Sequence, residues 1–294
     1  MSTWLAVVNE QAGGGGTTTA RARRALEVAG VDHHLMAPRT RAVMTDAVAG
    51  AVADGQRHFV AVGGDGTVNA LANDLLAHAW TQPPVLGVLP AGTGCDLIRT
   101  FGISQHMEEA ATHLSRPGEY LIDVAIARGD WGHRFFLNVG EAGVAAAAVQ
   151  RADRLPTWLG RARYPLGLAL ALPGFTRTRV EVESERRNFS GQALAVVFAN
   201  GQFFGGGFNI APKATLVDGL LDVQVITAKK WRAGTLVPRI YRGMHLADRD
   251  IRRFTARQVR IDTAEPWPVE IDGEYLGNTP VTVDVAPGRI ALKI

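Results

Sequence analysis

The chain has 294 residues, on the order of two domains, and 47% of them are apolar, which is enough for buried cores. A net charge of +3, from 31 basic and 28 acidic residues, is too small to indicate a nucleic-acid-binding protein. The single cysteine, Cys95, excludes an internal disulfide, and neither a leader nor a membrane-spanning stretch is visible, so we expect a cytoplasmic protein.

Short apolar runs alternate with helical patterns in the first part of the chain. We predict strands at residues 4–8, 31–36, 58–62 and 85–89, with helices at residues 18–29, 42–52 and 68–76. Apolar strands separated by helices favour a mostly parallel sheet covered by helices, with ligands at the carboxyl ends of the strands. Residues 1–122 are therefore predicted to form an α/β nucleotide-binding domain.

From about residue 123 the pattern becomes period-two alternation, with turn residues between short runs. The predicted strands are residues 121–127, 134–139, 178–183, 193–199, 220–226, 259–261, 269–271, 279–285 and 289–294, and residues 164–172 form a helical insertion. This pattern favours an antiparallel, sandwich-like all-β domain over residues 123–294. We expect a cleft between the two domains.

The most informative segment is the glycine turn that follows the strand at residues 58–62. Its residues are Gly63, Gly64, Asp65, Gly66 and Thr67, and a helix follows. Unpaired N–H groups at a helix N-terminus attract anions, and glycines let the main chain approach a phosphate. Asp65 would repel a bare phosphate, so a divalent cation bound to a nucleotide is its expected partner. An ordinary strand-to-helix turn, capped by Asp65 or Thr67, remains the alternative.

Further glycine turns follow two other predicted strands. Residues 89–96, Leu-Pro-Ala-Gly-Thr-Gly-Cys-Asp, place Gly92, Thr93, Gly94 and Asp96 after the strand at residues 85–89, and Gly13 to Gly16 come after the first strand. In the turns at residues 63–67 and 89–96 no lysine follows the glycines and no G-x-G-x-x-G is complete, so neither turn matches the Walker or the dinucleotide-binding pattern.

The ordered set of motifs resembles the diacylglycerol kinase catalytic family, which includes bacterial lipid kinases and sphingosine and ceramide kinases. Beyond the two glycine turns and Asn69, the likeness extends almost to the end of the chain. It includes residues 136–140 (Phe-Leu-Asn-Val-Gly), Asn200-Gly201, the glycines at 205–207, residues 211–214 (Ala-Pro-Lys-Ala), residues 217–223 (Val-Asp-Gly-Leu-Leu-Asp-Val) and residues 271–274 (Ile-Asp-Gly-Glu).

The resemblance implies an ATP-dependent lipid kinase that uses Mg²⁺. It implies that the nucleotide is held by Asn9, Gly63, Gly64, Asp65, Gly66, Thr67, Asn69, Gly92, Thr93, Gly94 and Asp96. Glu10 stands where the family usually has proline after that asparagine, and Cys95 stands where it usually has asparagine before the aspartate. The thiol is a weaker hydrogen-bonding group than an amide.

The same resemblance implies roles for two acidic residues in the second half of the chain. Glu274 resembles the family's general base, and together with Asp65 it is our predicted catalytic residue. Residue spacing alone predicts a hairpin turn at Asp272-Gly273-Glu274. Asp218, with the main-chain carbonyls of Thr215 and Leu220, would hold a structural Mg²⁺.

The expected partners are ATP and a lipid alcohol at the inner membrane surface. Arginines gather at residues 151–163 and 249–260, where they could contact anionic headgroups or line ordinary solvated faces. Apolar and aromatic residues at 158–170 and 203–208 could contact lipid or lie in the core, and exposed edge strands could pair two chains. Two alternatives stay open: a kinase for NAD or another soluble alcohol, and a non-catalytic relative that binds nucleotide or lipid.

Overall fold

The computed structural model of the protein describes residues 3–12, 16–92 and 95–294. The chain forms two compact units. One comprises the residues up to Val124 together with Pro287–Ile294, and the other comprises Ala125–Ala286.

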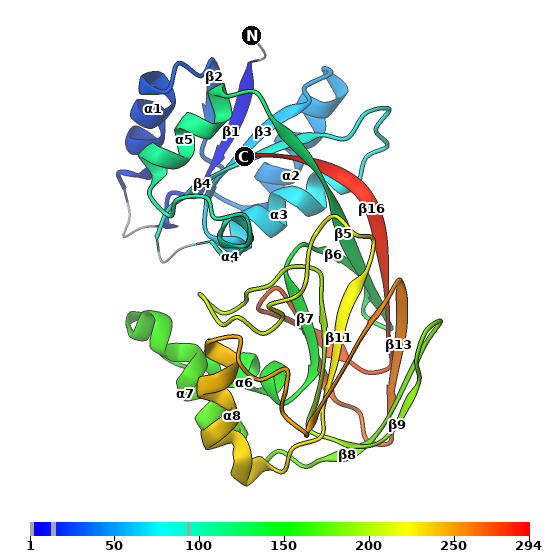
Figure 1. Ribbon diagram of the computed structural model, residues 1–294. Coiled ribbons are helices and arrows are strands. Elements are labelled where there is room, and N and C mark those ends of the chain that lie inside the picture. Colours follow the sequence, from blue (N-terminus) through cyan, green and yellow to red (C-terminus); the bar gives the residue numbers. More distant parts are fainter. Residues whose placement is uncertain (1–2, 13–15, 93–94) are drawn as a thin grey trace. The chain divides into compact units, whose positions relative to one another are not determined.

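The first unit is built on a parallel sheet in the strand order β2-β1-β3-β4 (Figure 1). Its strands are β1 (Trp4–Val8), β2 (His33–Met36), β3 (His58–Gly63) and β4 (Val85–Pro90), and its helices are α1 (Thr18–Val28), α2 (Arg41–Ala53), α3 (Asp65–Leu76), α4 (Asp96–Thr100) and α5 (Met107–Ser115). Helix α1 packs with α5, and α2 packs with α3. Strand β4 is buried along its whole length, as expected for a parallel strand covered on both faces. The α/β fold predicted for this part of the chain is confirmed.

The last strand, β16 (Val281–Lys293), ends in the first unit. Ala291 and Leu292 pair in parallel with Val85 and Leu86 of β4. The sequence pattern predicts a strand at residues 289–294 and assigns it to the second domain. A period-two pattern identifies a strand but does not say which sheet it joins.

The second unit contains two antiparallel sheets that enclose an apolar core. One has the order β12-β11-β10-β7-β14-β15, and in the other β13 lies between β8 and residues 281–284 of β16, β9 pairs with β8, and β5 pairs with β6. The strands are β5 (Glu119–Gly129), β6 (Gly132–Phe136), β7 (Val139–Gly143), β8 (Thr178–Ser184), β9 (Phe189–Ala193), β10 (Ala195–Ala199), β11 (Leu221–Ile226), β12 (Ile251–Ala256), β13 (Gln258–Thr263), β14 (Pro268–Ile271) and β15 (Glu274–Asn278). Both sheets contribute to one core cluster, with Phe198 and Val223 from the first and Val180 and Ile261 from the second. The predicted sandwich-like fold is therefore also confirmed.

A layer of helices covers the outer face of the β10 sheet. It consists of α6 (Val144–Asp153), the 3-10 turn η2 (Thr157–Ala162), α7 (Arg163–Ala171), the 3-10 turn η3 (Lys230–Arg232) and α8 (Ala233–Tyr241). The sequence pattern predicts only the helix at residues 164–172. The buried face of α6 consists mostly of alanines, which give a weak apolar signal, and α8 contains Pro238, which usually argues against a helix.

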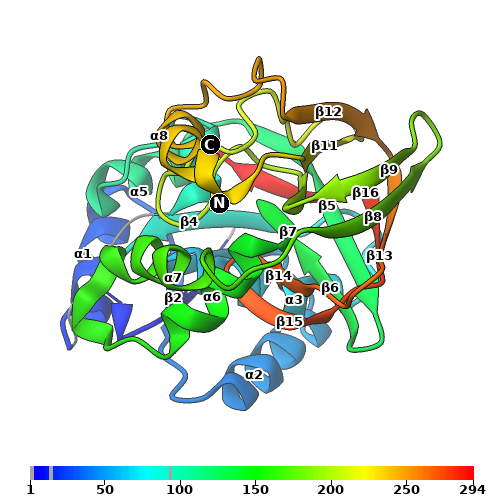
Figure 2. The same cartoon turned by 90° about the horizontal axis from the view of Figure 1, so that it is seen from below.

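Close packing of α6 against α7 explains one glycine in this layer (Figure 2). A Cβ added at Gly167 of α7 would lie 2.4 Å from the carbonyl oxygen of Ala148 in α6. Because no side chain fits at that distance, only glycine lets the two backbones approach so closely.

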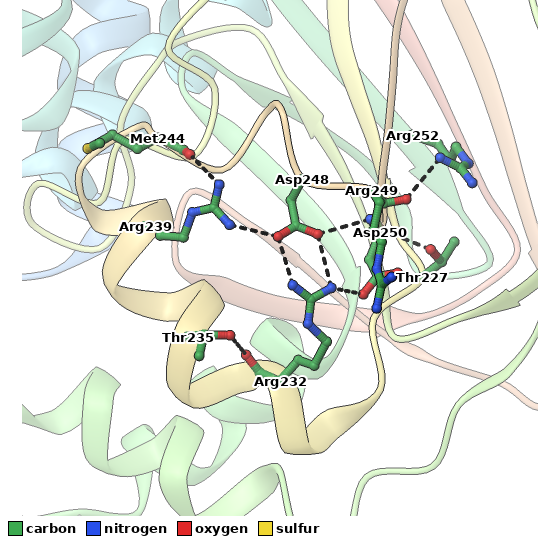
Figure 3. Close-up of polar contacts among 9 residues, drawn as sticks. All are labelled: Thr227, Arg232, Thr235, Arg239, Met244, Asp248, Arg249, Asp250 and Arg252. Carbon is green, nitrogen blue, oxygen red and sulfur yellow. Dashed lines mark hydrogen bonds and ion pairs between the residues drawn. The ribbon is translucent and has the colours of Figure 1, made fainter.

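Helix α8 is anchored by a group of ion pairs around Asp248 (Figure 3). The buried Asp248 carboxylate accepts from Arg232 at 2.9 Å and from Arg239 at 2.8 Å, and Arg232 also pairs with Asp250. The backbone N–H of Asp250 and these guanidinium groups hold the pKa of Asp248 below its ordinary value. Both arginines belong to η3 or α8, so the loop after α8 fixes the position of that helix.

Candidate functional site

The glycine turn after β3 ends at the N-terminus of α3, as predicted. A Cβ on Gly63 would lie 2.3 Å from the hydroxyl oxygen of Thr67, so a larger residue would push this side chain aside. The same hydroxyl accepts from the Asn9 side-chain amide at 3.2 Å, and Asn9 follows β1. The structure therefore brings Asn9 and Thr67 together from neighbouring strand ends, while Asn69 lies buried in α3.

Asp65 connects this turn to the second glycine turn. Its Oδ1 atom accepts from the backbone N–H of Asp96 at 2.7 Å and from the Cys95 thiol at 3.3 Å. The Ala91 N–H donates to the Gly63 carbonyl at 2.9 Å. Asp65 thus caps the start of α4, a contact that the sequence does not indicate.

The side chain of Gln105 fixes the main chain of Cys95 by two hydrogen bonds. The Gln105 side chain accepts from the Cys95 N–H at 2.8 Å and donates to its carbonyl at 3.1 Å. Burial, followed by the charge of Asp65, raises the pKa of the Cys95 thiol well above its ordinary value. The thiol therefore stays protonated and acts as a hydrogen-bond donor.

Parts of the predicted site lie outside the described residues. These are Thr93 and Gly94 of the second turn and Gly13 to Gly15 of the turn after β1. Of the second turn, Gly92 has a φ of 96°, which favours glycine, and Asp96 is buried with Arg99 at 3.4 Å.

An open pocket of about 780 Å³ lies at the carboxyl ends of β1 and β2, beside the glycine turn. Asn9, Gly66 and Thr67 line it, and so does Glu10, whose carboxylate accepts from the hydroxyl of Thr19. This volume is within the range of nucleotide-sized ligand sites, and the position is the one expected for a doubly wound sheet.

Most of the other pocket residues are absent from the site predicted from sequence. They come from the connection between β2 and α2 and from the beginning of α2, and include Pro38, Arg39, Thr40, Arg41 and Met44. Arg41 makes a bidentate contact with the buried Asp74 of α3, with N–O distances of 2.5 and 2.7 Å. Their position in the sequence could have indicated them, because they directly follow a predicted parallel strand and ligands often bind at the connections after such strands.

In the second unit, Asp272 and Gly273 form the hairpin turn that spacing predicts between β14 and β15. Their φ angles are 48° and 83°. The Asp272 carboxylate accepts three backbone N–H groups, those of Leu137, Asn138 and Val139, at 3.0–3.2 Å. This carboxylate therefore fixes the turn to the connection between β6 and β7.

Glu274 follows that turn as the first residue of β15. Its carboxylate is 58% exposed and forms an ion pair with Arg134 of β6, and both residues belong to the second unit. The hairpin turn and an exposed carboxylate are thus both present, and the catalytic role of Glu274 remains a prediction.

The predicted metal position lies in the loop before β11. Asp218 is exposed, and its Oδ1 atom accepts from the Leu220 N–H at 3.0 Å. Within the described residues, no group of three or more His, Cys, Asp or Glu side chains is arranged to hold a metal. A site here would depend on main-chain oxygens, and its role remains a prediction.

An apolar cavity of about 70 Å³ lies within the second unit, between the β10 sheet and helices α7 and α8. Its lining includes Tyr164, Leu168, Phe204, Phe208 and Leu236. Tyr164 makes edge-to-face contacts with both phenylalanines, at centroid distances of 5.3 and 5.6 Å. Three of the aromatic residues suggested from sequence as lipid contacts are thus gathered around one cavity, whereas Trp158 and Phe203 do not line it.

Two family models match successive parts of the chain. Residues 3–126 match the model of the diacylglycerol kinase catalytic domain, and residues 138–294 match the YegS C-terminal NAD kinase beta sandwich-like domain. A protein from Pseudomonas savastanoi pv. phaseolicola named "Probable lipid kinase YegS-like" is 30% identical over 251 residues, which cover 83% of this chain and 78% of the relative. The chain belongs to the diacylglycerol kinase family of lipid kinases.

Other members of the family are similar over most of their length. The diacylglycerol kinase of Bacillus subtilis (strain 168) is 29% identical over 232 residues, covering 76% of this chain and 72% of that protein. A crystal structure described as that of a "putative diacylglycerol kinase" from Bacillus anthracis str. Sterne superposes with a TM-score of 0.80 at 26% identity, covering 99% of this chain and 97% of the other. Family membership supports a kinase and implies ATP as phosphate donor. No helix among the described residues is long and apolar enough to span a bilayer.

Proposed function

We propose that this member of the diacylglycerol kinase family transfers the γ-phosphate of ATP to the hydroxyl of diacylglycerol or a related lipid alcohol. The observation that carries the proposal is the pocket beside the glycine turn, where Asn9, Gly66 and Thr67 surround the N-terminus of α3. A helix N-terminus with glycine at its first turn favours phosphate groups, and the family supplies the reaction class.

The nucleotide would be held mainly by main-chain groups. Gly63, Gly64 and Gly66 leave room for phosphate at the N-terminus of α3, and the second turn, with Gly92, Thr93, Gly94 and Asp96, would complete the cradle. Asn69 lies buried within α3, where its side-chain oxygen accepts from the Asn73 amide at 3.1 Å, and it would contribute to the same site. Arg39 and Thr40 extend the pocket on the β2 side.

Magnesium fits the oxygen-rich groups at two places. Asp65 would help hold the ion that accompanies ATP, which neutralises charge on the transferred phosphoryl group. Asp218, with the main-chain carbonyls of Thr215 and Leu220, would offer three oxygen ligands to a structural ion, and oxygen ligands are those that Mg²⁺ prefers.

Glu274 is the proposed general base. Its carboxylate is exposed and could accept the proton of the lipid hydroxyl. Asp272 holds the turn that carries it, through three backbone hydrogen bonds. Asp272 is thus a positioning residue in this scheme.

The apolar cavity would take part of a hydrocarbon chain of the acceptor lipid. Large apolar side chains are exposed on the elements that surround it, including Leu166 and Leu170 on α7 and Trp231 in η3. Lys229 and Lys230 lie beside Trp231, and such a mixture of aromatic and basic groups suits the surface of an anionic membrane. We therefore propose that the enzyme acts at the inner membrane surface, facing the cytoplasm.

The protein could also form a homodimer by pairing an edge strand such as β12 with that of a second copy. Sedimentation of the purified protein, which gives its mass in solution, tests this.

The test measures transfer of labelled γ-phosphate from ATP to diacylglycerol in mixed micelles with Mg²⁺. Asp65→Asn and Glu274→Gln should each lower turnover by about 100-fold or more, the usual effect of losing an acid–base or electrostatic group. Asp54→Asn and Glu265→Gln alter exposed acids in the same units and are the matched controls. Native turnover in the first two variants would contradict the assigned roles.

Two other outcomes would favour a different function for the protein. Transfer to NAD or to a soluble alcohol without any lipid would favour a small-alcohol kinase. Protection of the folded protein by ATP, with no transfer to any acceptor, would indicate a non-catalytic relative.

A further inference from the structure

Arg41 of α2 lies in the wall of the pocket beside the glycine turn, and its guanidinium group is held in place by α3. Its Nη1 and Nη2 atoms donate to the carboxylate oxygens of Asp74, and Nη2 also donates to the Ala70 carbonyl at 3.1 Å. The Asp74 side chain is 6% exposed and accepts from the Thr45 hydroxyl as well, at 3.1 Å. The Arg41 side chain, by contrast, is 46% exposed and lines the pocket.

These contacts use the edges of the Arg41 guanidinium group. Arginine presents its N–H donors in rigid forks, and such a fork is what grips a phosphate group through two parallel hydrogen bonds. Asp74 occupies the fork formed by Nη1 and Nη2, and the Ala70 carbonyl takes the second N–H of Nη2, which breaks the fork on the other side. What Arg41 still offers to a ligand is the flat face of a delocalised cation, and such a face stacks on aromatic rings.

The ion pair is built to position Arg41 rather than to stabilise the fold. A buried carboxylate loses its hydration, and apolar residues in place of a buried ion pair are often as stable or more so. Asp74 carries that loss, while Arg41 keeps about half of its side chain in the pocket. A side chain that is already fixed binds a ligand without the entropy cost of being ordered at that moment. The arrangement therefore suits a contact between Arg41 and a ligand.

Arg41 lies beyond the end of the pocket that favours phosphate groups. Thr67 is in the first turn of α3, where anions are attracted, and Ala70, which bonds Arg41, follows about one turn or 5 Å later in the same pocket wall. Pro38 and Met44 also line the pocket, so apolar groups accompany the planar cation. A nucleotide whose phosphates lie at the start of α3 has its sugar and base still to place, and this part of the pocket suits an aromatic ring.

We propose that Arg41, positioned by Asp74, is the platform on which the nucleobase of the phosphate donor stacks. This inference rests on the proposed function, because it concerns the nucleoside end of the site that binds ATP. Stacking uses the face of the base and does not read its edge. Arg41 therefore favours the larger purine rings over pyrimidines and treats adenine and guanine alike. Arg41 contacts the substrate, and Asp74 is a positioning residue.

The first experiment is calorimetric titration of the full chain with Mg²⁺ and without lipid. The probes are ATP and inorganic tripolyphosphate, which has a phosphate chain of the same length but no base. Arg41→Lys keeps a charge that can pair with Asp74 but removes the flat group. It should weaken ATP binding by about fivefold, the effect of one cation–π contact, and leave tripolyphosphate binding unchanged. GTP should lose the same factor as ATP, and UTP should lose less.

Three further variants separate stacking from a purely structural link between α2 and α3. The double variant Arg41→Leu with Asp74→Leu removes both charges and keeps an apolar contact, and it should reproduce the effect of Arg41→Lys. Asp74→Asn leaves Arg41 in place but loosens it, so ATP should bind about threefold more weakly and tripolyphosphate as before. Arg23→Lys, an exposed change on α1 in the same unit, is the matched control and should alter neither probe.

The second experiment measures phosphate transfer to diacylglycerol with ATP or UTP as donor. The base takes no part in the reaction, so stacking stabilises the bound substrate and the transition state equally. Arg41→Lys should therefore raise the KM for ATP by about fivefold with kcat unchanged, and it should reduce the preference for ATP over UTP. A merely structural role would change kcat, or would change the KM of both donors by the same factor.

The outcomes distinguish this inference from the proposed function. If Arg41→Lys weakens ATP and tripolyphosphate alike, or leaves the affinity for ATP as it was, the stacking role is wrong although the protein is a kinase. If the native protein neither binds ATP nor transfers phosphate from it to any lipid, the kinase function itself fails, and the stacking role fails with it.

Discussion

The nucleotide pocket of the first unit and the apolar cavity of the second are built in opposite ways. The pocket is open, mixes polar and apolar groups, and is lined by three short segments of the chain, residues 7–11, 37–44 and 66–70. The last of these begins in the glycine turn. The cavity is lined by residues that range from Glu141 to Ile240 and come from several strands and helices. A phosphate site made of local backbone can be found from sequence, whereas a site assembled by packing becomes visible only in the fold.

The two regions also treat their acidic groups differently. Asp65 receives backbone and thiol hydrogen bonds and ties two turns together. Glu141 and Glu270 receive one backbone hydrogen bond each and lie next to one another in an apolar layer. The first acid thus contributes to its local structure, and the second pair opposes the stability of its surroundings.

The largest expected effect is the pH dependence of stability caused by Glu141. Its pKa is about 8 in the folded protein against an ordinary value of 4.5, so the unfolded chain releases the proton first as pH rises. The contribution to stability is fully present below pH 4.5 and is lost as pH rises through 8, by up to about 5 kcal/mol. Urea unfolding at several pH values should show this loss in the native protein and a smaller one in Glu141→Gln.

Glu270 has a raised pKa as well, so the double variant with both glutamines should be flatter still between these pH values. Glu265→Gln should retain the native dependence, since that residue is exposed. If the free energy of unfolding falls with pH equally in the native protein and in Glu141→Gln, ionisation of Glu141 does not oppose folding, and the prediction is wrong.

The second effect tests how tightly the glycine turn is packed. In Gly63→Ala the new methyl group would lie 2.3 Å from the Thr67 hydroxyl, and we expect a loss of about 2 kcal/mol in the free energy of unfolding. Gly66→Ala is the matched change, because its Cβ meets nothing within 4 Å. That variant should gain up to about 1 kcal/mol from helix propensity while weakening ATP binding in the pocket. Thermal unfolding with and without ATP would separate the two effects, and equal stability of both variants would contradict the prediction.

Much of the fold could be predicted from sequence because its signals are local. Apolar strands between helices indicated the parallel sheet, and period-two alternation indicated the sandwich. Helices α6 and α8 were missed because the buried face of α6 consists mostly of alanines, which give a weak apolar signal, and because α8 contains a proline. The pairing of Ala291 with β4 was missed because partner choice in a sheet depends on distant segments.

The candidate site could likewise be predicted only where its signals are local. Contacts such as that of Asn9 with Thr67 follow from the rule that ligands bind at the carboxyl ends of parallel strands. The role of Asp65 as a cap for α4 and the pairing of Glu141 with Glu270 depend on register and tertiary packing. Single acidic residues in apolar surroundings carry no period that sequence analysis could detect.

A smaller effect is expected at the ion pairs that anchor α8 (Figure 3). This helix forms one wall of the cavity. Asp248→Asn keeps the shape of the side chain but weakens its charged hydrogen bonds to Arg232 and Arg239, at a cost of about 1 kcal/mol. Hydrogen exchange should accelerate in α8 and remain unchanged in the first unit. Asp262→Asn, in an exposed pair with Arg260, is the control and should have almost no effect. Unchanged exchange in α8 would show that the helix is held by its apolar contacts alone.

The smallest effect is expected at Cys95, where this chain differs from the family pattern. Gln105 fixes the main chain of residue 95 from both sides, so the backbone of the second turn does not depend on the side chain. Asparagine is a stronger donor to Asp65 than a thiol, but it adds a polar group in a fully buried position. These terms oppose each other, and Cys95→Asn should change ATP affinity by less than about threefold, which corresponds to under about 1 kcal/mol. Cys95→Ala removes the donor without adding a polar group, and so measures the thiol contact by itself. A change above tenfold in Cys95→Asn alone would mean that residue 95 acts on the nucleotide itself, and the local backbone would then not be sufficient to build the phosphate site.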